Sequence, residues 1–182
     1  GTNEINRELT VDQLLKRAMR GQLDLLGPAQ AAMLGGPLAE VAAPAQLAAA
    51  WLAVENLKLA TLQVSAMGTM AYMQGLEKEQ ELIARVADMI GHVYLAESAL
   101  LRAATLLGTK QEQVAVAMAA LYAFSAVDRA RPLAAEALRR IPRGPEGMGR
   151  LNAYLPDHGI DLIALRRRVA TAVYEADGYP LG

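Results

Sequence analysis

The chain has 182 residues, a formal net charge of −1 at pH 7 and a sequence pI near 6.2. This charge balance gives no general electrostatic attraction to nucleic acid, so we expect no nucleic-acid partner. Cysteine is absent, which excludes disulfide bonds and cysteine-ligated metal sites. Aromatic residues make up only 4% of the chain and β-branched residues form no alternating runs. The sequence therefore predicts an all-α fold.

The first 44 residues predict a short helix followed by a linker. Residues 10–13 (TVDQ) have the form of a capping box, in which the Thr and Gln side chains satisfy free N–H groups. We expect this box to open a helix that runs to Arg20 and ends at Gly21. Residues 27–44 combine several glycines and prolines with alanines, which is typical of a linker, with a fragment of helix over Pro28–Leu34.

Three long helices and a closing helix follow. The apolar periodicity and the stop signals predict helices over residues 45–74, 77–107 and 109–140, and a last helix over 162–176 with Asp161 as its N-cap. The connections at Gly75 and Gly108 are very short, so neighbouring helices must run antiparallel. We therefore predict a four-helix up-down bundle preceded by a short N-terminal helical stub. The best candidate for a membrane span, residues 114–127, is only 14 residues long and contains Ser125, so it predicts a buried helix.

The first seven residues and several later segments resemble a known enzyme family. Residues 1–7 (GTNEINR) resemble the acyl-CoA dehydrogenase segment in which the catalytic glutamate is followed by Gly-Thr, a short polar run and Arg. Further segments resemble, in the same order, the helical extension of long- and very-long-chain-type members. These are residues 56–60 (NLKLA), 77–81 (EKEQE), 86–90 (VADMI), 97–102 (ESALLR) and 159–167 (GIDLIALRR).

The resemblance implies a function for the longer protein and roles for the first residues. It implies FAD-dependent α,β-dehydrogenation of an acyl-CoA, with a catalytic glutamate immediately before Gly1, so no catalytic residue lies in this chain. Gly1 would line the substrate side, and Thr2, Asn3 and Glu4 would approach the FAD. Electrons would pass to an electron-transfer flavoprotein. We expect the 182-residue chain alone to be inactive, to carry no FAD, and to fray at this polar terminus.

The same resemblance implies a division of the chain and a set of partners. Residues 1–36 would be the end of the dehydrogenase core domain plus linker, and residues 37–182 a C-terminal helical bundle extension. The main partner would be the protein's own dehydrogenase core, in a cytoplasmic protein. The alternative is a helical interaction, dimerisation or membrane-association module without an enzymatic role. Homo-oligomerisation and a membrane-peripheral location stay open.

Glu97 and the two histidines are the polar residues that call for a site interpretation. Glu97 interrupts an otherwise apolar helix face, and we expect a facing helix to supply its partner, with Lys58 as the candidate, in a structural role. A di-metal carboxylate bundle needs Glu-x-x-His on two helices, whereas the chain has only His92 and His158. The sequence therefore predicts no metal site.

Three further patterns have a structural interpretation that we favour over a functional one. The methionines Met67, Met70 and Met73 predict core filler. Gly68 and Gly91 inside helices predict close approach of a neighbouring helix. The arginines are interpreted as solvated side chains, although a basic patch facing CoA phosphates or a membrane surface is the alternative. They are Arg139, Arg140, Arg143 and Arg166 to Arg168.

Overall fold

The computed structural model of the chain describes residues 2–36 and 38–181, and within these ranges every regular element is a helix. The all-α prediction is confirmed. The α-helices are α1 (Thr2–Met19), α2 (Leu26–Leu34), α3 (Ala48–Tyr72), α4 (Gln80–Ala104), α5 (Glu112–Arg140), α6 (Met148–Tyr154) and α7 (Leu162–Glu175). Two 3-10 helices, Met73–Lys78 and Gly144–Gly147, lie in the connections.

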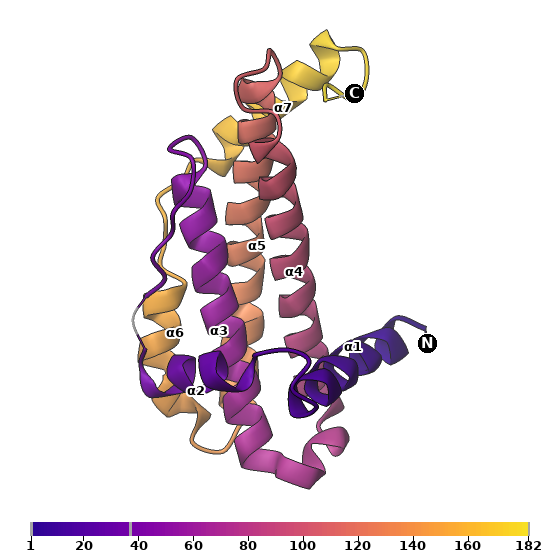
Figure 1. Cartoon of the computed structure of the whole chain (residues 1–182), viewed down its shortest axis with the longest axis vertical. Helices are drawn as coiled ribbons and strands as arrows, with labels where there is room; N and C mark the ends of the chain where they lie inside the picture. Colours follow the sequence, from indigo (N-terminus) through magenta and orange to yellow (C-terminus); the bar gives the residue numbers. More distant parts are fainter. Residues whose placement is uncertain (1, 37, 182) are drawn as a thin grey trace.

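The three long helices α3, α4 and α5 form the body of the molecule (Figure 1). Their shared core contains fully buried large side chains such as Leu57, Met89 and Leu100. On α5 the buried positions are mostly alanines, among them Ala123, Ala130 and Ala134. Small side chains let helix axes come close, so the long apolar stripes of α3 and α4 pack directly onto α5.

The predicted four-helix up-down bundle is not confirmed. The closing helix α7 packs mainly against α5 and lies at one end of the bundle, not along its length (Figure 1). None of the residues of α7 is buried. The helices α3, α4 and α5 already cover much of one another's apolar surface. The short helices α2 and α6 cover parts of α3 that a fourth long helix would occupy.

Helix ends show where local sequence signals decide the structure. Asp161 is the N-cap of α7, as predicted, and its Oδ1 accepts hydrogen bonds from the N–H groups of Ile163 and Ala164 at 2.9 Å. The predicted capping box at Thr10 is wrong, because α1 already begins at Thr2 and Thr10 donates to the carbonyl of Asn6 within the helix. The described part of this terminus, from Thr2 onward, is helical, and the expected fraying stays a prediction.

The linker between α1 and α3 is held by the far end of the chain. The predicted fragment of helix at Pro28–Leu34 is confirmed, with its start two residues earlier. The hydroxyl of the buried Tyr154 donates to the carbonyl of Ala32 at 3.1 Å, and Arg150 Nη1 donates to the carbonyl of Met33 at 2.8 Å. These bonds satisfy the last carbonyls of α2, which have no partner within their own helix. They fix α2 against α6 and thereby shape the surface beside α3.

Candidate functional site

The residues that the resemblance implicates in the active site lie on the outer end of α1. Thr2, Asn3 and Glu4 occupy its first turn and are exposed, whereas Gly1 lies outside the described residues. Figure 1 shows this end of α1 projecting away from the bundle. Hydroxyl and amide groups such as those of Thr2 and Asn3 suit a ribityl or phosphate partner. On one exposed turn they provide at most one edge of a flavin site, and their role stays a prediction.

The inner part of α1 is anchored on α4 by an ion pair. Arg7 Nε lies 2.6 Å from Asp88 Oδ1, and both side chains are partly exposed. The hydrogen bond to Asp88, together with its charge, raises the pKa of Arg7 above its ordinary value. Only Val11 and Ala18 of α1 are buried. These two residues, with Leu14 and Leu15, also line an opening between α1 and the bundle.

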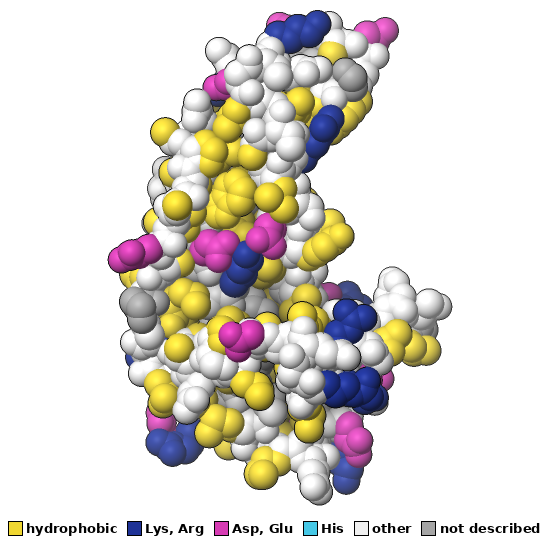
Figure 2. All heavy atoms as spheres, viewed as in Figure 1, with side chains coloured by type: hydrophobic (Ala, Val, Ile, Leu, Met, Phe, Trp, Pro, Cys, Tyr) yellow, Lys and Arg dark blue, Asp and Glu magenta, His cyan; other side chains and the backbone are white. Residues whose placement is uncertain are grey.

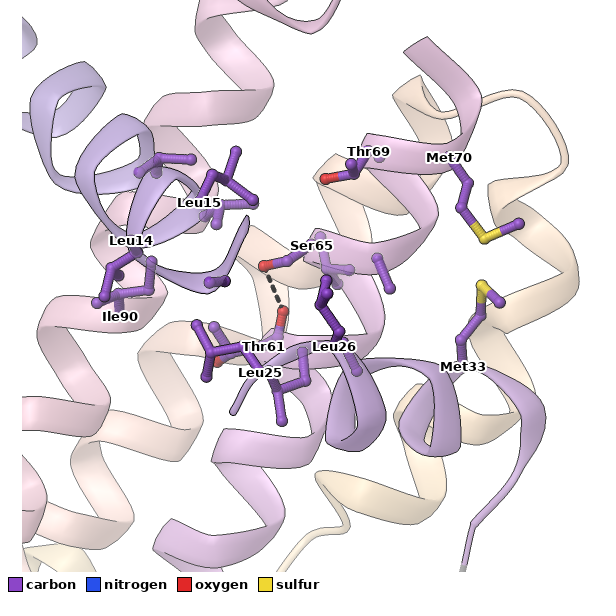
Figure 3. A pocket seen from close by; sticks show the side chains of 18 of the residues that line it. Leu14, Leu15, Leu25, Leu26, Met33, Thr61, Ser65, Thr69, Met70 and Ile90 are labelled. Atoms are coloured by element: carbon purple, nitrogen blue, oxygen red, sulfur yellow. Dashed lines mark hydrogen bonds between the residues drawn. The ribbon is translucent and has the colours of Figure 1, made fainter. Parts of the chain in front are cut away.

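This opening is an apolar groove between α1, α2, α3 and α4, with a volume of about 780 Å³. Figure 3 shows Leu14 and Leu15 on α1 facing the same space as Thr61 and Ser65 on α3. The wall from α1 consists of Val11, Leu14, Leu15 and Ala18; that from α2 includes Ala29 and Met33; that from α4 includes Ile83, Val86, Ile90 and Val93. The groove falls within the volume range of ligand and peptide pockets.

Three hydroxyl groups line the apolar groove, and those of Thr61 and Ser65 have hydrogen-bond partners along α3. Thr61 Oγ1 donates to the carbonyl of Leu57 at 2.8 Å, and Ser65 Oγ donates to the carbonyl of Thr61 at 2.7 Å. These bonds run along α3 and direct no donor into the groove. Apart from Gln30, Lys58 and Thr69, the lining is therefore suited to apolar side chains or alkyl groups.

Methionines form part of the rim of the apolar groove, and the sequence did not predict this. Figure 3 shows Met33 on α2 and Met70 on α3 pointing toward each other. Met70 is 63% exposed and Met73 is 75% exposed, so the interpretation of this cluster as core filler is wrong for both. Met67 is partly buried against the core. Met70 lies in the last turn of α3 and Met73 begins the 3-10 helix that follows it.

Glu97 has the partner that the sequence predicted. Lys58 Nζ lies 2.6 Å from Glu97 Oε1 and 2.8 Å from Glu55 Oε1, at the α3–α4 contact. Burial disfavours the charge on Lys58, but the hydrogen bonds to Glu55 and Glu97 outweigh it, so the pKa of Lys58 is raised above its usual value. All three side chains are about one-third exposed. The group links α3 to α4 and has a structural role.

Replacing Lys58 by methionine tests the strength of this link. We expect Lys58→Met to lower the free energy of unfolding by about 1 kcal/mol, because it leaves two neighbouring carboxylates without a counter-charge. Adding Glu97→Gln should recover at least half of the loss. The control is Lys16→Met, which removes an exposed pair with Asp12 on α1 and should change stability by less than about 0.5 kcal/mol. Urea denaturation measures all four proteins, and equal effects at both lysines would contradict the prediction.

The histidines lie apart from any candidate metal cluster. Asp88, the acidic residue nearest in sequence to His92, is paired with Arg7. The ring of His158 lies 5.2 Å from the ring of Phe124, and burial, together with the charge of Arg131, lowers the pKa of His158 below its usual value. Across residues 2–36 and 38–181, no group of three or more His, Asp or Glu side chains could hold a metal ion.

The arginines do not form one basic patch. Arg139 and Arg140 end α5 beside α6, whereas Arg166 to Arg168 lie on α7 at the opposite end of the molecule (Figure 1). Arg140 also pairs with Glu79 at 2.6 Å, and Arg143 pairs with Glu146 at 2.9 Å. A site for CoA phosphates that combines the two clusters is therefore excluded.

None of the helices in the described part of the chain combines the length and the apolar character that a membrane span requires.

The described residues thus define an all-helical domain whose main surface feature is an apolar groove. A family model described as "Acyl-CoA dehydrogenase, C-terminal domain" matches residues 56–153, which contain α4, α5 and most of α3. The chain belongs to this family. The segments quoted for the resemblance between residues 56 and 102 lie inside the matched region.

Two relatives extend the match to nearly the whole chain. A probable acyl-CoA dehydrogenase of Bacillus subtilis (strain 168) is 27% identical over 98% of this chain and 32% of its own length. The crystal structure of an acyl-CoA dehydrogenase complexed with FAD from Bacillus anthracis superposes with a TM-score of 0.85 at 26% identity. It matches 96% of this chain and 31% of its own. The chain therefore spans about a third of the length of these relatives.

Proposed function

We propose that this chain is the C-terminal helical part of a FAD-dependent acyl-CoA dehydrogenase and serves that enzyme as a non-catalytic scaffold. The observation that carries the proposal is the family match over the central helices, joined to a structural match with about a third of an acyl-CoA dehydrogenase that binds FAD. The parent reaction is α,β-dehydrogenation of an acyl-CoA thioester. The carboxylates of the Lys58 ion group, Glu55 and Glu97, are both paired with Lys58.

In this proposal the first residues of the chain belong to the edge of the catalytic site. The base is a glutamate that directly precedes Gly1, Gly1 lies beside the acyl thioester, and Thr2, Asn3 and Glu4 lie toward the FAD. Residues 1–36 close the dehydrogenase core and residues 37–182 form the extension. The exposure of Thr2, Asn3 and Glu4 supports this view, because a neighbouring domain can reach them. FAD supplies the hydride acceptor, and an electron-transfer flavoprotein takes the electrons.

The coding sequence upstream of Gly1 tests the proposal. We expect a glutamate codon immediately before Gly1, preceded in frame by a dehydrogenase core about twice as long as this chain, as the coverage of the relatives indicates. The product of the whole frame should bind FAD and oxidise an acyl-CoA in a dye-reduction assay. The 182-residue chain purified alone should be colourless and inactive.

Three outcomes would contradict parts of this proposal. A frame without a dehydrogenase core would favour the alternative, a helical interaction module without an enzymatic role. Another residue in place of the glutamate would remove the assigned base. Stoichiometric flavin absorbance on the 182-residue chain would show that the chain holds the cofactor without the core.

A further inference from the structure

We propose that the apolar groove is the contact site for the rest of the dehydrogenase core, so that an apolar segment of that core fills the space between α1, α2, α3 and α4. This inference rests on the proposed function and adds to it the place where the two parts of the enzyme join. It assigns an interaction surface to Leu26, Leu34 and Met70, the rim of the groove, which no role in the core of this domain explains.

The rim carries large apolar side chains that are open to solvent in this chain. Leu26 is 65% exposed, Leu34 is 69% exposed and Met70 is 63% exposed. Figure 2 shows several apolar side chains at the surface around α2 and the adjoining part of α3. Leu26, Leu34 and Met70 are also among the residues that line the groove. Large exposed apolar surfaces on folded domains mark contacts with another protein or domain.

The position of α1 supports the same conclusion. An 18-residue helix that buries only Val11 and Ala18 gains little free energy from its contact with α4. It also exposes a second apolar row, in which Ile5 is 64% exposed and Leu9 is 51% exposed. Because apolar side chains occur on both sides of α1, this helix is suited to lie between two packing partners. One partner is the bundle, on the side of Val11 and Ala18, and the second contacts the side of Ile5 and Leu9.

The length of the relatives identifies the occupant as more of the same polypeptide. About two thirds of each relative lies outside the matched segment. The superposition covers 96% of this chain, so the helices that wall the groove have the same arrangement in that longer, FAD-bound protein. A core joined to α1 lies next to the groove at a high effective concentration, which a second copy or a free lipid would not have. The apolar lining suits leucine-rich helix surfaces.

Thiol labelling of the full-length holoenzyme tests this assignment, because the 182 residues contain no cysteine of their own. Leu26→Cys, Leu34→Cys and Met70→Cys place thiols on the rim. Tyr174→Cys places one on α7, where the side chain is 85% exposed. All four positions are exposed in this chain, so the replacements should leave the fold intact. Mass spectrometry of the labelled peptides gives the labelling rate of each thiol in the native and in the unfolded protein.

If the core fills the groove, native-state labelling of the rim thiols should be at least about tenfold slower than that of the α7 thiol, relative to the unfolded protein. Equal rates at the rim and at α7 would overturn the inference and leave the proposed function standing. Protection that disappears on dilution would indicate a second copy, and protection that appears only with added lipid vesicles would indicate a lipid surface; each result overturns it. An open reading frame that encodes no dehydrogenase core would instead contradict the proposed function, before any labelling is done.

Discussion

Replacing Leu100 by alanine is expected to lower the free energy of unfolding by about 2–5 kcal/mol, the usual cost of a large cavity in a packed core. Leu100 lies on α4 and its side chain is 0% exposed. The helices around it are rich in buried alanines, which are too short to move into the vacated space. The cavity should therefore persist, and the loss should fall in the upper half of that range. Urea denaturation followed by circular dichroism measures the effect.

Leu101 provides the matched control for this experiment. It is the next residue on the same helix, but its side chain is 53% exposed. Leu101→Ala removes the same atoms and should change stability by less than about 0.5 kcal/mol. Similar losses at both positions would mean that the face of α4 turned toward α5 is assigned wrongly. The comparison requires that both variants have the same m value, the slope of the free energy of unfolding against urea concentration. A changed m value would indicate a change in the unfolding reaction itself.

The sequence predicted the fold class and the long helices because these depend on local patterns. The apolar row on α4 and the stop at Gly108, which has φ +76°, gave helix limits within a few residues of those observed. The pairing of Lys58 with Glu97 was also predictable, since a carboxylate in an apolar row needs a cation from a facing helix. Each of these inferences needs knowledge of only one helix and its nearest neighbour.

The apolar groove and the arrangement of the short helices were not predictable in this way. Which face α1 turns to α4 depends on Arg7 and Asp88, which are 81 residues apart in the sequence. A solvent-exposed methionine such as Met70 has the same spacing as a core methionine, so the sequence alone does not distinguish the two. Likewise Gly68 approaches Leu82 closely, as predicted, whereas Gly91 has open space beside it and that prediction is wrong.

A scaffold role explains how the charged groups are distributed. The ion group of Lys58 and the pair of Arg7 with Asp88 both join α4 to another helix, and neither lies in an enclosed polar site. Partly exposed pairs of this kind add little stability but fix which helices meet and in what register. If the chain is the scaffold that we propose, the register of α1 against α4 matters, because the residues proposed to approach the flavin lie on α1.

Gly144 lies where any side chain would collide with the end of α5, and replacing it is expected to have the second large effect. A Cβ atom at this position would overlap the carbonyl oxygen of Leu138 and lie 2.8 Å from its carbonyl carbon. Both atoms belong to backbone in the last turns of α5, so no side-chain rotation relieves the clash. Gly144→Ala should lower the free energy of unfolding by about 2–4 kcal/mol, because the turn that leads from α5 into α6 must move.

Gly149, five residues further on, separates this clash from the general effect of adding a methyl group. It lies in α6, and a Cβ atom there would meet no other atom within 4 Å. Gly149→Ala should leave stability unchanged or raise it by up to about 1 kcal/mol, because alanine is the better helix former.

The Gly144→Ala replacement should also loosen the packing of α2, since α6 carries Tyr154, which donates a hydrogen bond to the end of α2. Hydrogen exchange in α2 should therefore be faster in Gly144→Ala than in Gly149→Ala. Unchanged exchange would mean that the turn absorbs the methyl group locally and that α6 does not fix α2.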